Sequence, residues 1–321
     1  MTEKIEYKKS SSLFSKYEYI WQQRNNTLDS IFWFIQKYHI EMDDYGNITV
    51  TNTEAKDVPA FCCHLDTVHT QDPVPQLIKD DILLSFAGGI GGDDKCGIIA
   101  CLEMLETMPC KCIFFRDEET GCKGSSKYDT ESLKDNLFLI EIDRRSGTDL
   151  IFNSGGTILC DDQFKDEVKA YFPHGEEAQG TMTDVNVLGD AEINMMNLSA
   201  GYYNPHSNSE YVILSELQRN IDCLKAFAGN YCAKRKFKRE VNKYYGYSSE
   251  TQGTMFPGYG GYDYEYDRND DYSATDAWYK MQFGRNWKQV KAEDEAYLRQ
   301  WEQNTQNSAP DKSAKGKSKK K

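Results

Sequence analysis

Five short clusters of acidic residues and histidine constrain this 321-residue chain more than any other feature. They are FCCHLDTVH (61–69), GGDDKCG (91–97), RDEETG (116–121), EIDRR (141–145) and YNPHSNSEYV (203–212). Each cluster falls where a short apolar run, typical of a strand, gives way to a loop. Open α/β sheets build their sites at the carboxyl ends of their strands. Two imidazoles and several carboxylates at that edge favour a pair of divalent metal ions, with zinc the leading candidate.

The apolar pattern between these clusters predicts the fold. Residues 27–39 and 213–232 repeat apolar side chains at i, i+3, i+4 and i+7, which indicates amphipathic helices, the second with Ser215 as its N-cap. A third helix is predicted over 94–108. The runs PAFCCH, DDILLSF, CIFFRD, LFLIEID and DLIFNS are typical of strands. Strands that alternate with helices predict an α/β domain with a mostly parallel or mixed central sheet and helices on both faces.

The composition changes near residue 240, which sets the predicted domain boundary of an α/β domain over 1–240. Residues 244–272 contain eight tyrosines with many Gly, Asp and Asn. We therefore expect a Tyr/Gly/Asp-rich low-complexity extension over 241–285, because such a stretch buries too little apolar area to fold alone. A further helix is expected over 286–304 and a disordered lysine-rich tail over 305–321.

Charge and cysteine content limit the partners of the chain. The net charge is −13, and because the last ten residues hold six lysines the remainder carries −13 − 6 = −19. An acidic body argues against nucleic acid as the main ligand, although the tail would allow weak contact. No apolar run approaches the ~18 residues of a membrane span, and the N-terminus does not resemble a secretory signal. The ten cysteines are expected to be reduced thiols, as in a cytoplasmic protein.

Residue spacing within the clusters suggests particular roles. On a strand, residues i and i+2 share a face, so Asp66 can hold the second ring nitrogen of a metal-binding His64. A carboxylate at the glycine-to-helix junction, Asp93, can bridge two cations. Adjacent acids at a strand end, Glu118 and Glu119, can divide the tasks of proton transfer and metal binding. Taken singly, each cluster is more simply a buried histidine, a helix N-cap or a solvated acidic turn; the joint occurrence favours a site.

The series HLDTV, GGDDKCG, RDEETGCKGS, EIDRR, TDVNVL and GYYNPHSNSEYV resembles the co-catalytic zinc exopeptidases over roughly residues 36–227, and most closely their peptidase T (tripeptidase) branch. The resemblance implies two Zn²⁺ ions, with Co²⁺ or Mn²⁺ as substitutes. It implies one ion on His64, Asp93 and Asp143, and a second on Asp93, Glu119 and His206. Glu118 would be the general base on a water between the ions, and Asp66 the partner of His64. It also implies a cis peptide bond between Asp93 and Asp94.

The chain departs from larger members of that family at one place. Asp143 and His206 are 63 residues apart, which is too short for the inserted lid or dimerisation domain of those relatives. We therefore expect a short, monomeric form without the histidine that the lid supplies, so that Tyr202 or Tyr203 would join the metals in stabilising the developing oxyanion. Arg144 or Arg145 is a candidate for binding a substrate carboxylate, although surface arginines are the simpler interpretation.

Three functions remain open from the sequence. The first is hydrolysis of short peptides by an aminopeptidase or tripeptidase. The second is removal of an acyl group from a small N-acyl metabolite, which the same metal site would support. The third is a non-enzymatic protein with a vestigial site that acts through its C-terminal extension.

Overall fold

The computed structural model describes residues 11–239 of the chain. The predicted segments 241–285, 286–304 and 305–321 lie outside the described residues. The helices are α1 (Ser11–Lys16), α2 (Glu18–Gln22), α3 (Leu28–Ile35), α4 (Gly92–Thr107), α5 (Asp162–Tyr171), α6 (Asp184–Val187) and α7 (Leu214–Asn230), with short 3₁₀ turns η1 (Ser125–Lys127), η2 (Thr130–Leu133) and η3 (Gly189–Ala191). The strands of the main sheet are β1 (His39–Met42), β2 (Ile48–Thr51), β3 (Ala60–His64), β6 (Lys111–Phe115), β7 (Leu139–Arg144), β8 (Asp149–Ser154), β9 (Thr157–Ile158), β10 (Glu176–Gly180) and β11 (Met195–Ser199).

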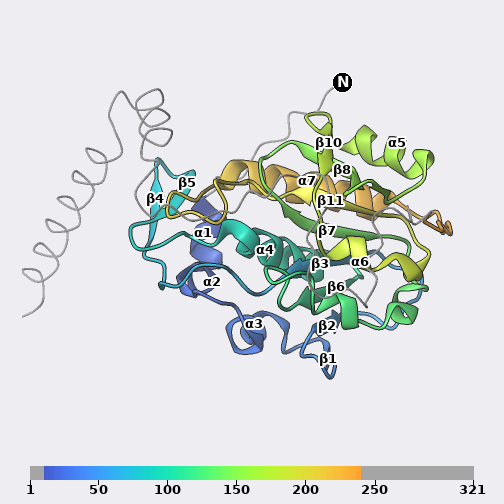
Figure 1. Ribbon diagram of the computed structural model, residues 1–321, viewed down its shortest axis with the longest axis horizontal. Coiled ribbons are helices and arrows are strands. Elements are labelled where there is room, and N and C mark those ends of the chain that lie inside the picture. The colour runs from blue at the N-terminus through green and yellow to red at the C-terminus, as the bar shows by residue number, and fades with distance from the viewer. Residues whose placement is uncertain (1–10, 240–321) are drawn as a thin grey trace, which may run out of the picture. The chain divides into compact units, whose positions relative to one another are not determined.

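The main sheet is mixed and has a parallel centre. Its order is β1-β2-β6-β3-β7-β11-β8-β10, with β9 paired to β8 (Figure 1). Strands β6, β3, β7 and β11 run parallel to one another, whereas β1–β2, β2–β6 and β11–β8 are antiparallel pairs. The mostly parallel or mixed sheet expected from the sequence is therefore confirmed.

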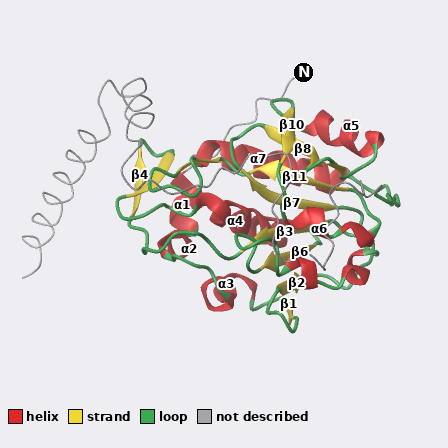
Figure 2. Cartoon of the chain, viewed as in Figure 1, coloured by secondary structure: helices red, strands yellow, loops and turns green. Residues whose placement is uncertain are grey.

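Each face of the sheet buries its own core because side chains alternate along the strands. In β3, Phe61 and Cys63 pack into the larger core, which α4 and α7 cover, while Ala60 and Cys62 face a smaller core beneath η2, α6 and η3. Helices on both faces are thus confirmed, although within residues 11–239 the smaller core is covered by the four-residue helix α6 and the 3₁₀ turns η2 and η3 (Figure 2). Burial on both faces explains why the first four residues of β3, AFCC, are apolar without alternation.

A second, smaller sheet lies beside the first and is entirely antiparallel. Its order is β12 (Tyr202–Tyr203), β13 (Tyr211–Ile213), β5 (Ile82–Ser85) and β4 (Pro75–Ile78). The connection between β12 and β13, residues 204–210, carries His206. This sheet therefore fixes the last of the sequence clusters.

Two helix predictions need correction. The predicted helix over 27–39 ends at Ile35, because His39 begins β1 and pairs with β2, and its Phe32 is exposed. Ser215 does not cap the C-terminal helix, which already begins at Leu214. Instead Asp81, from the turn between β4 and β5, accepts hydrogen bonds from the backbone N–H (2.7 Å) and the hydroxyl (2.9 Å) of Ser215. A side chain distant in sequence has taken over the capping role.

Two further expectations concern the cysteines and membrane-spanning helices. The ten cysteines are free thiols, and eight of them are buried. Among residues 11–239, no helix has the length and apolar character needed to cross a lipid bilayer.

Candidate metal centre

Sheet topology brings the five clusters together at one edge. His64 is the last residue of β3, Glu118 and Glu119 follow the end of β6, and Asp143 lies near the end of β7. Because β6, β3 and β7 are neighbours and parallel, the three strand ends lie side by side, with His64 in register with Phe115. Asp93 comes from the start of α4, and His206 from the β12–β13 loop.

Asp93 lies at the centre of this group. Its Oδ1 is 3.0 Å from Nε2 of His64, and its Oδ2 is 3.2 Å from Nε2 of His206. The same nitrogen of His206 is 3.0 Å from Oε2 of Glu119. The two oxygens of one carboxylate therefore face two different imidazoles, which is the arrangement a bridging ligand needs.

Asp143 completes the group on the His64 side. Its Oδ1 is 3.7 Å from Nε2 of His64 and accepts a hydrogen bond of 2.9 Å from the hydroxyl of Tyr202. Its Oδ2 is 3.3 Å from the hydroxyl of Thr183. That hydroxyl also lies 2.7 Å from Oε1 of the fully buried Glu141. The Tyr202 hydroxyl thus orients the Asp143 carboxylate toward His64, while the shorter hydrogen bond of the Thr183 hydroxyl goes to Glu141.

Asp66 contacts His64 differently from the sequence expectation. Nδ1 of His64 is 3.0 Å from the backbone carbonyl of Asp66 and 3.5 Å from its carboxylate. The two carboxylate oxygens of Asp66 instead accept the backbone N–H groups of Glu118 (3.1 Å) and Glu119 (3.2 Å). Asp66 therefore orients the two adjacent acids as well as the histidine.

The two adjacent aspartates at the start of α4 have different contacts: Asp93 lies in the candidate metal centre, and Asp94 accepts backbone hydrogen bonds. The Asp93–Asp94 peptide bond is cis, as the resemblance implied, and neither residue has helical backbone angles. Asp94 turns its carboxylate inward, where it accepts the N–H groups of Gly97 (2.9 Å) and His64 (3.2 Å). A side chain at Gly97 would meet the carbonyl oxygen of Ile142 at 2.3 Å, so glycine there lets α4 lie close against β7.

The charges of this cluster are strongly coupled. Hydrogen bonds with Asp93 and then Glu119 raise the pKa of His206 to about 11. Burial would lower the pKa of His64, but the charge of Asp143 and its hydrogen bonds raise it well above the usual value. Burial and the charge of Asp93 raise the pKa of Asp143 to about 6. For Glu118, burial outweighs the opposing effect of His64 and raises the pKa to about 9. Without metal, protons on the histidines balance the buried carboxylates.

The donor set fits hard or borderline divalent cations. It consists of imidazole nitrogens and carboxylate oxygens, the ligands that zinc takes in catalytic sites. One ligand atom each of His64, Asp93 and Glu119 lies within 4.8 Å of the others, and so do those of His64, Glu118 and Asp143. Oε1 of Glu119 is buried and has no hydrogen-bond partner within residues 11–239. A buried carboxylate oxygen without a partner is costly, and a cation would satisfy it.

Other residues suggested by the sequence lie in different surroundings. The hydroxyl of Tyr202 donates to Asp143, and that of Tyr203 donates to Glu216 at 2.6 Å, so both protons are already engaged. Nε of Arg144 pairs with Asp149 at 2.9 Å, while Arg145 is exposed.

The sequence reasoning missed four residues around the site, which are Glu141, Thr183, His69 and Glu210. All of them lie inside the motifs that carry the resemblance or next to them, yet nothing in the local pattern indicates contacts across 40 to 140 positions.

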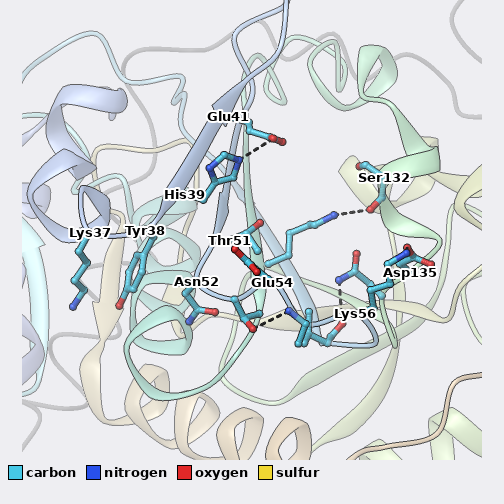
Figure 3. Close-up of a pocket in the computed structure, with 15 residues that line it drawn as sticks. Lys37, Tyr38, His39, Glu41, Thr51, Asn52, Glu54, Lys56, Ser132 and Asp135 are labelled. Carbon is cyan, nitrogen blue, oxygen red and sulfur yellow. Dashed lines mark hydrogen bonds and ion pairs between the residues drawn. The ribbon is translucent and has the colours of Figure 1, made fainter.

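A cleft of about 710 Å³ lies elsewhere on the domain. Its lining includes Lys111 at the start of β6 and Thr51 at the end of the antiparallel β2, so it opens at the amino ends of the parallel strands, opposite the candidate metal centre. The predicted site residues all lie within 11–239, and none of them lines it. Within the cleft, Lys56 pairs with Asp135 at 3.0 Å and Lys111 donates to the carbonyl of Ser132 (Figure 3).

Comparison with known proteins shows the fold. A scan against protein-family models gave no match, and neither did a comparison with curated proteins. Among solved structures, aminopeptidase PepT from Bacillus cereus matches with a TM-score of 0.59 at 14% identity, over 68% of this chain and 98% of that one. A tripeptidase from Staphylococcus aureus matches with a TM-score of 0.56 at 13% identity, over 69% and 99%. An aminopeptidase from the archaeon Desulfurococcus kamchatkensis matches with a TM-score of 0.59 at 10% identity, over 70% and 96%. The chain therefore has the fold of these aminopeptidases.

Proposed function

We propose that this protein is a di-zinc exopeptidase that hydrolyses short peptides, as an aminopeptidase or tripeptidase. The observation that carries the proposal is the Asp93 carboxylate, whose two oxygens face His64 and His206 with further acids beside each imidazole. The likeness in fold to an aminopeptidase and a tripeptidase supports the same reaction. We further propose a short peptidase T type without a lid, active as a monomer in the cytoplasm, where its free thiols would remain reduced.

The metals would be held by two overlapping sets of ligands. One set is His64, Asp93 and Asp143, and the other is Asp93, Glu119 and His206. When bound, two zinc ions would polarise the scissile carbonyl and lower the pKa of water. Co²⁺ or Mn²⁺ would fit the same donors.

Glu118 is the residue that we assign to proton transfer. It is largely buried, and burial raises the pKa of its carboxyl group to about 9, so the positive charge of bound cations would be needed to ionise it before it takes a proton. In the reaction Glu118 takes the proton of the attacking water and passes it to the leaving amine. Asp66 fixes its position by accepting the backbone N–H groups of Glu118 and Glu119.

The test is hydrolysis of defined substrates by the purified chain. We expect release of an amino acid from unblocked di- and tripeptides, loss of that activity with a metal chelator, and recovery on adding zinc. N-acylated amino acids should be hydrolysed far more slowly. Preference for N-acyl substrates would replace the peptidase assignment by a deacylase, and no hydrolysis of either class by the zinc-loaded chain would refute the proposal.

A further inference from the structure

Three loops that carry candidate metal ligands meet at one buried side chain, Glu210. The first loop follows His64 and contains His69. The second is the glycine-rich segment 88–93, which ends at Asp93. The third, 204–210, contains His206 and ends at Glu210 itself. These loops are far apart in sequence, so whatever joins them sets the relative positions of the three ligands.

Glu210 joins them through both of its carboxylate oxygens. Oε2 accepts the backbone N–H of Gly91 at 2.7 Å, and Oε1 accepts the backbone N–H of Asp93 at 3.0 Å. Nε2 of His69 lies 2.7 Å from the same Oε2 and donates to it. The Glu210 side chain is completely buried and that of His69 is 8% exposed, so solvent does not compete for these bonds.

Few contacts besides those of Glu210 define the shape of the glycine-rich segment, and most of these come from α4 and His69. Gly88 and Gly91 have positive φ angles, which glycine adopts readily and which give the chain no rigidity of its own. The ring of His69 lies against Gly89, where an added Cβ would come within 2.0 Å of it. From α4, the buried ammonium of Lys95 donates to the carbonyl of Ile90 at 2.6 Å. The segment is therefore held by side chains from outside it.

We propose that His69 is a positioning residue: by donating to Glu210 it holds the 88–93 segment in the shape that presents Asp93 to His64 and His206. We call the hydrogen bonds of Glu210 with His69, Gly91 and Asp93 the Glu210 clamp. Its effect on metal affinity rests on the proposed function, but the clamp itself does not. A hydrogen bond to a buried charged group contributes more than a neutral one, and losing its donor leaves the carboxylate underpaired. The Gly91 and Asp93 bonds would then open more often.

Three substitutions of His69 separate hydrogen bonding from packing. His69→Gln keeps an N–H donor but removes the ring, His69→Phe keeps a ring against Gly89 but removes the donor, and His69→Ala removes both. The matched control is His39→Phe, which breaks an exposed histidine–glutamate pair, His39 with Glu41 at 2.9 Å, on β1. Thermal unfolding of each variant checks that the domain stays folded.

The first readout needs no metal. Amide hydrogen exchange of Gly91 and Asp93 in the metal-free full chain should become about tenfold faster in His69→Phe and His69→Ala, as expected from a lost charged hydrogen bond. It should stay within about threefold of the parent in His69→Gln and in His39→Phe. Unchanged exchange in His69→Phe, or the same acceleration in His69→Gln, would overturn the proposal, because packing alone would then explain the contact.

The second readout is zinc affinity, measured by competition with a coloured chelator. His69→Phe should weaken zinc binding about tenfold, and His69→Gln should restore it to within about threefold. Equal affinity in the parent and His69→Phe would show that the clamp does not set the metal centre. If the parent bound no zinc at all, the proposed function would be wrong. Amide hydrogen exchange in the metal-free chain would still test the Glu210 clamp.

Discussion

Glu118 differs from its acidic neighbours in its contacts with the site histidines. Asp93 and Glu119 contact His206 directly, whereas the Glu118 carboxyl group forms no hydrogen bond with His64 or His206. Replacing it by glutamine removes the proton acceptor and preserves the shape. We expect Glu118→Gln to lower the rate of peptide hydrolysis by about 10²–10⁴ with zinc content unchanged. Asp117→Asn is the matched control, because Asp117 contacts Tyr45 at 2.8 Å instead of the site. Parental activity in Glu118→Gln would show that another group moves the proton.

Tyr202 and Tyr203 are adjacent but serve different carboxylates, which gives a paired test. Tyr202→Phe removes the 2.9 Å hydrogen bond to Asp143, whereas Tyr203→Phe removes the bond to Glu216. Because an oriented, hydrogen-bonded carboxylate is the better ligand, Tyr202→Phe should weaken zinc binding roughly tenfold, and Tyr203→Phe should leave it within about twofold. Chelator competition measures both. Equal affinities in the two variants would contradict the role of Tyr202.

The helices on the α4 face are joined by one buried acid, Glu103. Its carboxylate contacts Lys16 at 2.6 Å, the hydroxyl of Tyr17 at 2.9 Å and Lys225 at 2.6 Å, and so links α1, α4 and α7. Burial would raise its pKa, but the bonds to Lys16 and Lys225 outweigh that effect and lower it to about 2. A depressed pKa stabilises the fold above the unfolded value of 4.5, and this contribution is lost as the pH falls from 4.5 toward 2.

We therefore predict that Glu103→Gln lowers the free energy of unfolding at pH 7 by on the order of 2 kcal/mol. Its stability should also fall less steeply than that of the parent between about pH 4.5 and 2. Denaturant unfolding at several pH values measures both effects. Glu106→Gln is the control, because Glu106 pairs with Lys16 nearer the surface. Parallel pH profiles for Glu103→Gln and the parent would contradict this account.

Local patterns predicted β3 and α4, which are buried on all sides, from their apolar runs, and α7 from its single apolar face. They failed where a distant element decides the outcome. The helix that begins at Leu28 is cut short by strand pairing at His39, and α7 is capped by Asp81 from a hairpin more than 130 positions away. His64, Glu119 and Asp143 were predictable because they lie at or just after strand ends, and Asp93 because it follows a glycine pair at the start of a helix. Their supporting residues, such as Thr183 and Glu210, were not, because only the folded chain places them beside Asp143 and Asp93.

The predicted domain boundary near residue 240 stays a prediction; the candidate site and both hydrophobic cores lie before it. All of the candidate ligands belong to residues 64–206, and the buried Arg239 donates to the carbonyls of Val185 and Asn186 near the end of the described range. A chain ending at residue 240 keeps these contacts. We expect it to retain zinc affinity and peptide hydrolysis within about twofold, the usual effect of changes away from packed contacts. Loss of hydrolysis with intact folding would show that residues 241–321 contribute to the site.

The central claim is that side chains from five separate segments enclose two cations around Asp93. Diffraction from crystals of the zinc-loaded chain, collected on both sides of the zinc absorption edge, locates the metal without reference to activity. The account predicts two anomalous peaks, one among His64, Asp93 and Asp143 and one among Asp93, Glu119 and His206. No peak beside Asp93, or zinc bound only to other residues, would contradict it.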